Sequence, residues 1–223
     1  MALTLQQLID QLQNILSVSD PDQTWPEGKL REWVLQGIRE YSVRFPRRLS
    51  VSITPAVEGE GYARIYDLPL DFMDVLAVEW PEGADPPVWL ERKPETEAGF
   101  GAGHYDIRLS RDSVAAARLV LGERPTNAID KIRVYYLGLH NIALTPPDTL
   151  SVLEEDLELL IQFVKMRAFE ERLANETLAA DPTSDLVARL GHNARLAKEE
   201  FYRLVKQRER AVGGMVAWGG TER

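Results

Sequence analysis

The spacing of apolar residues changes twice along the chain, and this change limits the folds it can adopt. Both ends carry apolar residues at the i, i+3, i+4, i+7 spacing of a helical face, whereas the middle carries short runs rich in β-branched and aromatic residues. We therefore predict an α+β protein with an inserted antiparallel β module. Helices from the two ends would pack as a bundle, because each has one apolar face to bury.

Two helices are predicted in residues 1–48. The first begins at a capping-box spacing, Thr4 to Gln7, and ends before Asp20. The second begins near Thr24 and ends before Pro46, which disfavours the helical conformation of the residue preceding it. The two apolar stripes are Leu5, Leu8, Ile9, Leu12, Ile15 and Leu16, and Leu30, Trp33, Val34, Gly37, Ile38 and Tyr41.

Residues 49–146 are predicted to form the β module. Gly, Pro and Asp separate its short apolar runs, and no helical pattern lies between them, which argues against a parallel sheet built from βαβ units. The pattern is typical of an antiparallel sandwich or a small barrel. The expected strands are Leu49–Val57, Ala63–Leu68, Val75–Trp80, Val88–Arg92, Tyr105–Leu109, Ala117–Leu121 and Lys131–Leu139.

Residues 147–212 are predicted to form a hairpin of two long helices, followed by a glycine-rich tail, residues 213–223. The first of these helices has an acidic start at Glu154-Glu155-Asp156, which suits the helix dipole. The second would open with Asp181-Pro182 as N-cap and N1 and end at Gly213-Gly214.

Composition excludes several classes of protein. There are 35 acidic and 26 basic residues, a net charge of −9, which argues against general binding of nucleic acid phosphates. The absence of cysteine excludes disulfides, thiolate metal sites and cysteine nucleophiles. The first ten residues lack a basic and apolar signal pattern, and no apolar run approaches the roughly 20 residues that span a bilayer. We therefore expect a soluble cytoplasmic protein without a secretory signal.

The candidate chemical motifs are weak. Gly99-Phe100-Gly101-Ala102-Gly103 resembles a phosphate-binding loop, but it precedes a strand, so we predict a loop between strands. His104, His140 and His192 lack the spacing of helical metal ligands. We therefore predict no catalytic, cofactor or metal site.

The last helix is basic in an acidic chain. Between Asp185 and Arg210 there are seven basic and four acidic residues, a net charge of +3. One interpretation is charge complementation of the helix C-terminus; the other is a surface for an acidic partner or a neighbouring copy. The tail after it carries Met215 and Trp218, which are more typical of a binding segment than of a solvated end, although a disordered end stays open.

Several motifs occur in a definite order along the chain. They are Thr24–Val34 (TWPEGKLREWV), Gly37–Ser42 (GIREYS), Tyr66–Trp80 (YDLPLDFMDVLAVEW), Ile132–Tyr136 (IRVYY) and the acidic helix start Leu153–Asp156. In order and spacing, from about residue 3 to 210, the chain resembles the head-to-tail adaptor (connector) proteins of tailed bacteriophages. Each motif alone is common; their combination carries the resemblance.

The resemblance implies a virion structural protein without catalysis or cofactor. Members of that family form a ring, usually of twelve copies, beneath the portal protein, where they extend the DNA channel and dock the stopper or tail proteins. DNA would pass without specific binding, and an acidic subunit is compatible with that. The implied location is the head–tail junction of the virion, after assembly in the bacterial cytoplasm, with no membrane contact.

The resemblance also suggests two sets of contact residues. C-terminal segments of the family often reach the portal, which makes Gly213, Gly214, Met215, Val216 and Trp218 the portal-docking candidates. A closed ring needs two different faces on each subunit. Arg195, Arg203 and Lys206 of the basic helix could meet Glu154 and Glu155 of the acidic helix start across that contact, or within one subunit.

Two alternatives stay open. The first is another phage morphogenesis part, such as a tail-completion or stopper protein. The second is an enzymatic or small-ligand module in the β region around His104, Tyr105 and Asp106, which would require a concave pocket with convergent polar groups.

Overall fold

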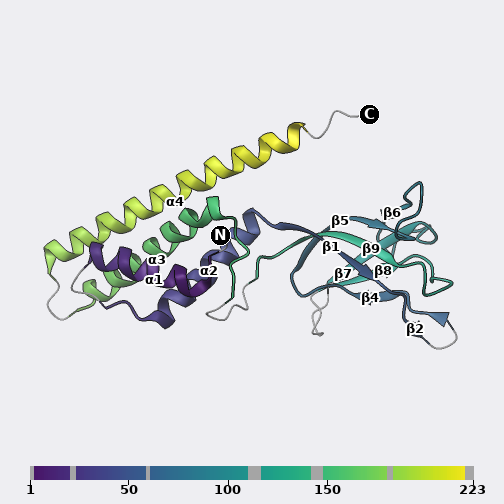
Figure 1. Cartoon of the computed structure of the whole chain (residues 1–223), viewed down its shortest axis with the longest axis horizontal. Helices are drawn as coiled ribbons and strands as arrows, with labels where there is room; N and C mark the ends of the chain where they lie inside the picture. Colours follow the sequence, from purple (N-terminus) through teal and green to yellow (C-terminus); the bar gives the residue numbers. More distant parts are fainter. Residues whose placement is uncertain are drawn as a thin grey trace. The chain divides into compact units, whose positions relative to one another are not determined.

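The computed structural model describes residues 3–20, 24–58, 61–109, 117–141, 148–179 and 183–218, with the last six as helix backbone only. The chain divides into two compact units: a helical unit of residues 1–41 and 141–223, and a β unit of residues 42–140. Figure 1 shows the helices of the first and the strands of the second. The predicted α+β fold with helices from both ends and an inserted sheet is confirmed.

In the residues that the structure describes, the helical unit contains four α-helices. They are α1 (Leu5–Ser19), α2 (Glu27–Arg44, whose last turn belongs to the β unit), α3 (Leu157–Thr177) and α4 (Ser184–Trp218), with a 3₁₀ turn, η1 (Glu154–Asp156), before α3. The predicted capping box of α1 is present: Thr4 Oγ1 accepts from the Gln7 N–H, and Gln7 Oε1 accepts from the Thr4 N–H.

α3 is the central helix of this unit. Its Phe163 packs edge-to-face on Phe201 of α4, with ring centroids 5.6 Å apart, and its Phe169 packs on Trp25 before α2 at 6.3 Å. α4 runs alongside α3 (Figure 1). α3 is buried over most of its circumference, which explains why its apolar residues extend beyond one stripe. Its buried residues are Leu159, Leu160, Ile161, Gln162, Phe163, Val164, Met166, Ala168 and Phe169.

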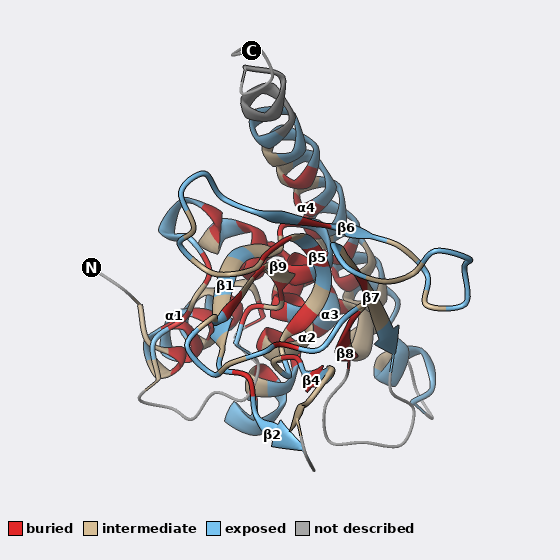
Figure 2. Cartoon of the chain, turned by 90° about the vertical axis from the view of Figure 1, so that its right-hand side faces the viewer, coloured by how far each residue is buried: buried red, intermediate tan, exposed pale blue. Residues whose placement is uncertain are grey.

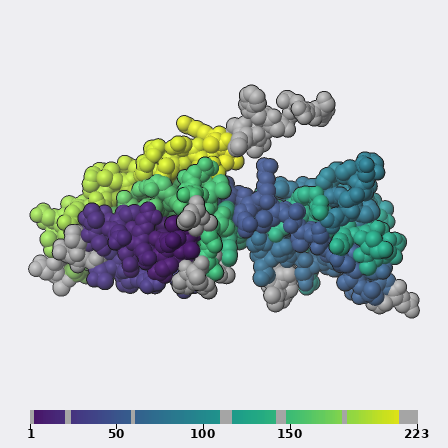
Figure 3. Space-filling view, in the orientation of Figure 1, coloured from purple at the N-terminus to yellow at the C-terminus, as the bar shows by residue number. Residues whose placement is uncertain are grey.

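α1 covers the bundle with one face and turns a polar face outward. Five residues of the predicted stripe, Leu5, Leu8, Ile9, Leu12 and Leu16, are fully buried, whereas Ile15 is only partly buried. Exposed positions such as Gln7, Asp10 and Gln11 lie on the other face, and Figure 3 shows α1 in purple at the surface of the helical unit.

The β unit holds a curled seven-stranded sheet and a separate two-stranded ladder. The order in the large sheet is β1-β9-β5-β6-β7-β8-β4, and β2 pairs with β3. All seven predicted strands are found. The bounds are β1 (Arg47–Ile53), β2 (Val57–Glu58), β3 (Gly61–Tyr62), β4 (Ile65–Asp67), β5 (Phe72–Glu79), β6 (Trp89–Arg92), β7 (His104–Leu109), β8 (Ala117–Leu121) and β9 (Ile132–Gly138).

One pairing differs from the antiparallel arrangement predicted from the sequence. β6 and β7 run parallel over two residue pairs, Glu91↔His104 and Arg92↔Tyr105. A parallel pair requires a connection that returns the chain to the same end of the sheet. Residues 93–103 make this return as a loop, without a helix, so the sequence carried no βαβ signal for it.

The strands alternate between a buried and a more exposed face. Along β9, Ile132, Val134 and Tyr136 are buried, whereas Arg133 and Tyr135 are partly exposed. Figure 2 shows the resulting red interior and blue periphery. Tyr66, Leu90, Tyr105, Leu119 and Leu121 contribute to the same core, which fills the inner side of the curled sheet.

The end of the last helix was predicted wrongly. α4 continues as helix to Trp218, past Gly213-Gly214, where the sequence indicated its end. Glycine disfavours a helix interior by only about 1 kcal/mol, and extending a formed helix is far easier than nucleating one. The predicted Asp181-Pro182 cap and residues 219–223 of the predicted tail lie outside the described residues.

Gly37 should be required by close packing of α2 on α3. A Cβ at this position would lie 3.0 Å from Phe163 Cδ1 and 3.3 Å from Leu160 Cδ2. We expect Gly37→Val to lower the free energy of unfolding by about 1–3 kcal/mol through overpacking. Denaturant unfolding of the full chain measures this. Gly28→Val is the matched control, because nothing lies within 4 Å of that position.

Candidate functional site

One alternative from the sequence was an enzymatic or small-ligand site in the β unit, around His104, Tyr105 and Asp106. In the structure, the polar side chains of His104 and Asp106 bind nearby backbone atoms. Asp106 accepts from the backbone N–H groups of Glu95 at 3.0 Å and Ile107 at 2.8 Å. His104 Nδ1 lies 3.0 Å from the Ala102 carbonyl oxygen, and Tyr105 is buried, which raises its pKa. These contacts stabilise the β6–β7 connection and do not converge on a shared space. Within the described ranges, no group of three or more His, Asp or Glu side chains is placed to hold a metal ion.

The glycines of the Gly99–Gly103 loop allow backbone conformations that other residues rarely adopt. Gly99 and Gly103 have φ values of 84° and 79°, in the left-handed region that favours glycine. A Cβ on Gly122 would lie only 1.9 Å from the Gly101 carbonyl oxygen, so two backbone segments meet here. The predicted loop between strands is confirmed, and its glycines have structural roles.

The basic residues predicted for a subunit contact lie on the exposed side of α4. The Arg203 guanidinium binds the Glu200 carboxylate through two hydrogen bonds of 2.6 and 2.7 Å, which lower the pKa of Glu200. Arg195 lies 3.9 Å from Glu199. Lys206 is exposed and forms no ion pair with any residue that the structure describes. Arg195 and Arg203 are therefore balanced within the same helix, whereas Lys206 is not.

The acidic start of α3 is paired within the subunit, by a residue that we did not single out from the sequence. Arg208 of α4 lies 2.6 Å from Glu155 Oε1 and 3.1 Å from Asp156 Oδ2. Asp156 is 5% exposed and accepts a 2.6 Å hydrogen bond from the Tyr41 hydroxyl. Burial, followed by this hydrogen bond, raises the pKa of Tyr41. The cluster joins α2, η1 and α4.

A second buried carboxylate was also missed. Asp20, which ends α1, is 1% exposed and lies 3.2 Å from Arg189 of α4 and 3.7 Å from Arg172 of α3. The sequence marked Asp20 only as part of a turn. Its partners are more than 150 residues away, so nothing local indicated the contact.

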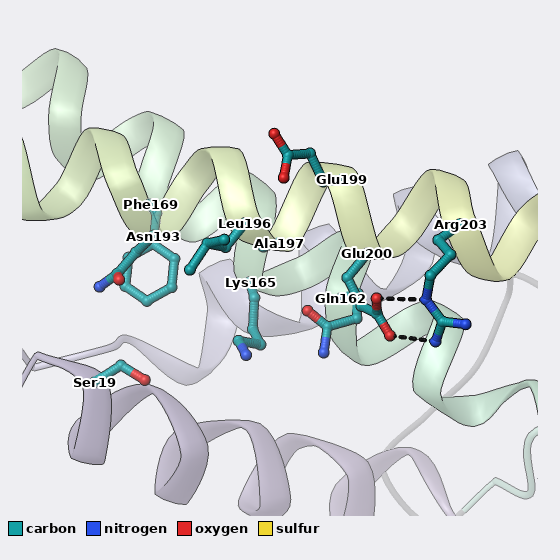
Figure 4. A pocket seen from close by; sticks show the side chains of 10 residues that line it. All are labelled: Ser19, Gln162, Lys165, Phe169, Asn193, Leu196, Ala197, Glu199, Glu200 and Arg203. Atoms are coloured by element: carbon teal, nitrogen blue, oxygen red, sulfur yellow. Dashed lines mark hydrogen bonds and ion pairs between the residues drawn. The ribbon is translucent and has the colours of Figure 1, made fainter.

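A groove of about 480 Å³ runs between α3, α4 and the end of α1. Figure 4 shows Phe169 and Ala197 as its apolar part, with the Glu200–Arg203 pair at one end and Ser19 on α1. It combines one ion pair with amide and apolar side chains. A smaller groove of about 190 Å³ lies beside Glu155 and Arg208.

The predicted portal-docking residues lie at the end of α4. Gly213, Gly214, Met215, Val216 and Trp218 are all within the helix. The preceding positions, Glu209 to Val212, are exposed. The ten residues that follow Arg208 in α4 correspond to about 15 Å of helix. None of the described helices is both long and apolar enough to cross a bilayer.

A family model described as SU10 adaptor protein matches residues 3–218, nearly the whole chain. A search of curated proteins found no match.

We expect Arg208→Ala to destabilise the helical unit by about 2–4 kcal/mol, because it leaves the buried Asp156 carboxylate without its cation. Urea unfolding of the full chain measures the change. Arg203→Ala on the same helix is the matched control and should leave the midpoint nearly unchanged, because its pair is exposed. Equal effects of the two substitutions would contradict a structural role for the Arg208 cluster.

Proposed function

Because this chain belongs to the SU10 adaptor protein family, we propose that it is the head-to-tail adaptor of a tailed bacteriophage virion. Family membership makes it a structural phage protein. The proposal adds that about twelve copies form a ring beneath the portal protein, extend the DNA channel and dock the stopper or tail proteins. The observation that carries it is the family match over residues 3–218, on a fold with helices from both ends and an inserted sheet.

The charges of the subunit suit a conduit for DNA. A protein that grips DNA neutralises phosphates with free Lys and Arg side chains, and its affinity falls steeply with salt. Here the net charge is −9, and Arg195, Arg203 and Arg208 each have a carboxylate partner in the same subunit. DNA would therefore pass the ring without being held. The proposed location is the head–tail junction, after assembly in the host cytoplasm.

The end of α4 is the proposed contact with the portal. Glu209 to Val212 are exposed, so this end of α4 is accessible to a partner. Met215, Val216 and Trp218 would supply apolar anchors, and Gly213 and Gly214 would permit close approach. Between subunits, Arg195, Arg203 and Lys206 stay the candidates on α4. Glu154 and Glu155 are weaker ones, because Arg208 already pairs with Glu155.

Deletion of residues 213–223 should weaken binding to the portal protein at least tenfold, because it removes a Trp anchor. Light scattering of the purified protein, alone and mixed with its portal protein, measures the assembled mass. Circular dichroism checks that the helical unit stays folded. Deletion of residues 219–223 alone is the control, and it should bind normally. Unchanged binding after the longer deletion would remove the docking role of this segment.

A further inference from the structure

The large sheet has two free edges. In the described part of the chain, β1 and β4 are the terminal strands of the order β1-β9-β5-β6-β7-β8-β4. β1 pairs with β9 over all seven of its residues. β4 pairs with β8, and flanking hydrogen bonds extend this pairing from Arg64 to Leu68. Each edge offers unpaired backbone N–H and C=O groups along its other side.

The β1 edge lacks most of the usual protection against pairing. Native proteins protect such edges with charged side chains, Pro, bulges or very short strands. β1 carries charge only at its start, on Arg47 and Arg48, and has no Pro or register shift, whereas the interior β5–β9 ladder has two shifts. Leu49 and Val51 are only partly buried against the core. A long regular edge with an incompletely covered apolar face is suited to receiving another strand.

Strand direction makes the two edges compatible. Of the six neighbouring pairs in the sheet, five are antiparallel and one, β6–β7, is parallel. Each antiparallel pair reverses the direction of the strand, and five reversals leave β1 and β4 running in opposite directions. Two copies in the same orientation, side by side, would therefore present β1 and β4 to each other as antiparallel strands. With six reversals the same contact would be parallel, which is the less stable pairing.

We propose that neighbouring copies associate edge to edge, with β1 of one copy pairing antiparallel with Arg64–Leu68 of the next. This rests on the proposed ring and names the surface that forms it. The contact joins two different edges, so it repeats from copy to copy, and it closes into a ring when the rotation between copies completes a full turn.

Side chains favour one register, in which Arg48 opposes Asp67. Leu49 then opposes Tyr66, both on the core side of the sheet, and Ser50 opposes Ile65 on the outer side. Arg48 is exposed and has no ion pair with a described residue. The Asp67 side chain is 64% exposed beside Arg118, so it can accept a second cation. Opposite charges therefore face each other on the outer side, and two apolar core-side residues, Leu49 and Tyr66, meet on the inner side.

Charge exchange tests this contact. R48D alone and D67R alone each place like charges across the junction, so each should associate on the order of tenfold more weakly than the wild type. An equimolar mixture of the two variants should recover association, because every junction in an alternating ring regains opposite charges. The double variant should recover it as well. Light scattering of the full chain, with and without the portal protein, measures all four samples.

The control is R118A. It removes the ion pair that Asp67 forms inside its own subunit, and it should leave association between copies unchanged. Failure of the mixture to recover would overturn the edge contact. Failure of the wild type to associate even with the portal would instead overturn the proposed ring. The two failures are therefore distinguishable.

Disulfide trapping provides an independent test, because the chain has no cysteine. Opposed residues in an antiparallel pair have a Cα separation that a disulfide can bridge. S50C and I65C in one chain should give a ladder of covalent multimers after oxidation, and neither single variant should. A dimer from S50C alone would indicate β1–β1 pairing between copies. A disulfide within one chain would indicate that the sheet closes on itself, and either result would overturn the proposal.

Discussion

Helix α3 packs against α1 and α2, which precede the β unit in the sequence, and against α4, which follows it. Its burial therefore requires residues from both ends of the chain to meet. The contacts of two buried carboxylates follow the same path: Tyr41 reaches Asp156, and Asp20 reaches Arg189. Backbone hydrogen bonds of Leu5 to Asp148 and of Leu150 to Leu3 join the two ends again. The helical unit cannot form from either half alone.

The same arrangement constrains the β unit, which must begin and end at neighbouring points. Ser42 at the end of α2 accepts a 3.0 Å hydrogen bond from the His140 N–H, and β1 and β9 pair along their full length. The chain thus enters and leaves the sheet on adjacent strands. β9 has β5 on its other side, and no other described strand pairs with β1, so β1 is an edge of the sheet next to the point where the chain leaves it.

The features predictable from the sequence are those set by neighbouring residues. The α1 cap and stripe, the seven strands and the loop at Gly99–Gly103 depend on spacing, turn chemistry and backbone freedom, all of which are local. The parallel β6–β7 pair and the Arg208 and Asp20 clusters depend on contacts across long sequence separations, which no local pattern encodes. The helical end of α4 was missed for a different reason: Gly213-Gly214 lowers helix propensity, but propensity is outweighed by propagation from a long helix.

The charge distribution explains why a subunit contact through backbone edges is physically reasonable. Copies with a net charge of −9 repel each other, and salt screens that repulsion only partly at short range. Part of the basic charge of α4 is already used within the subunit, because Glu200 binds Arg203, and Glu155 and Asp156 bind Arg208. Hydrogen bonds between strand edges are independent of net charge, and the β1 edge would bring Arg48, which has no ion pair with a described residue, to an exposed Asp67. The sheet edges therefore offer a way to offset repulsion between copies, in addition to the charged helix that the sequence indicated.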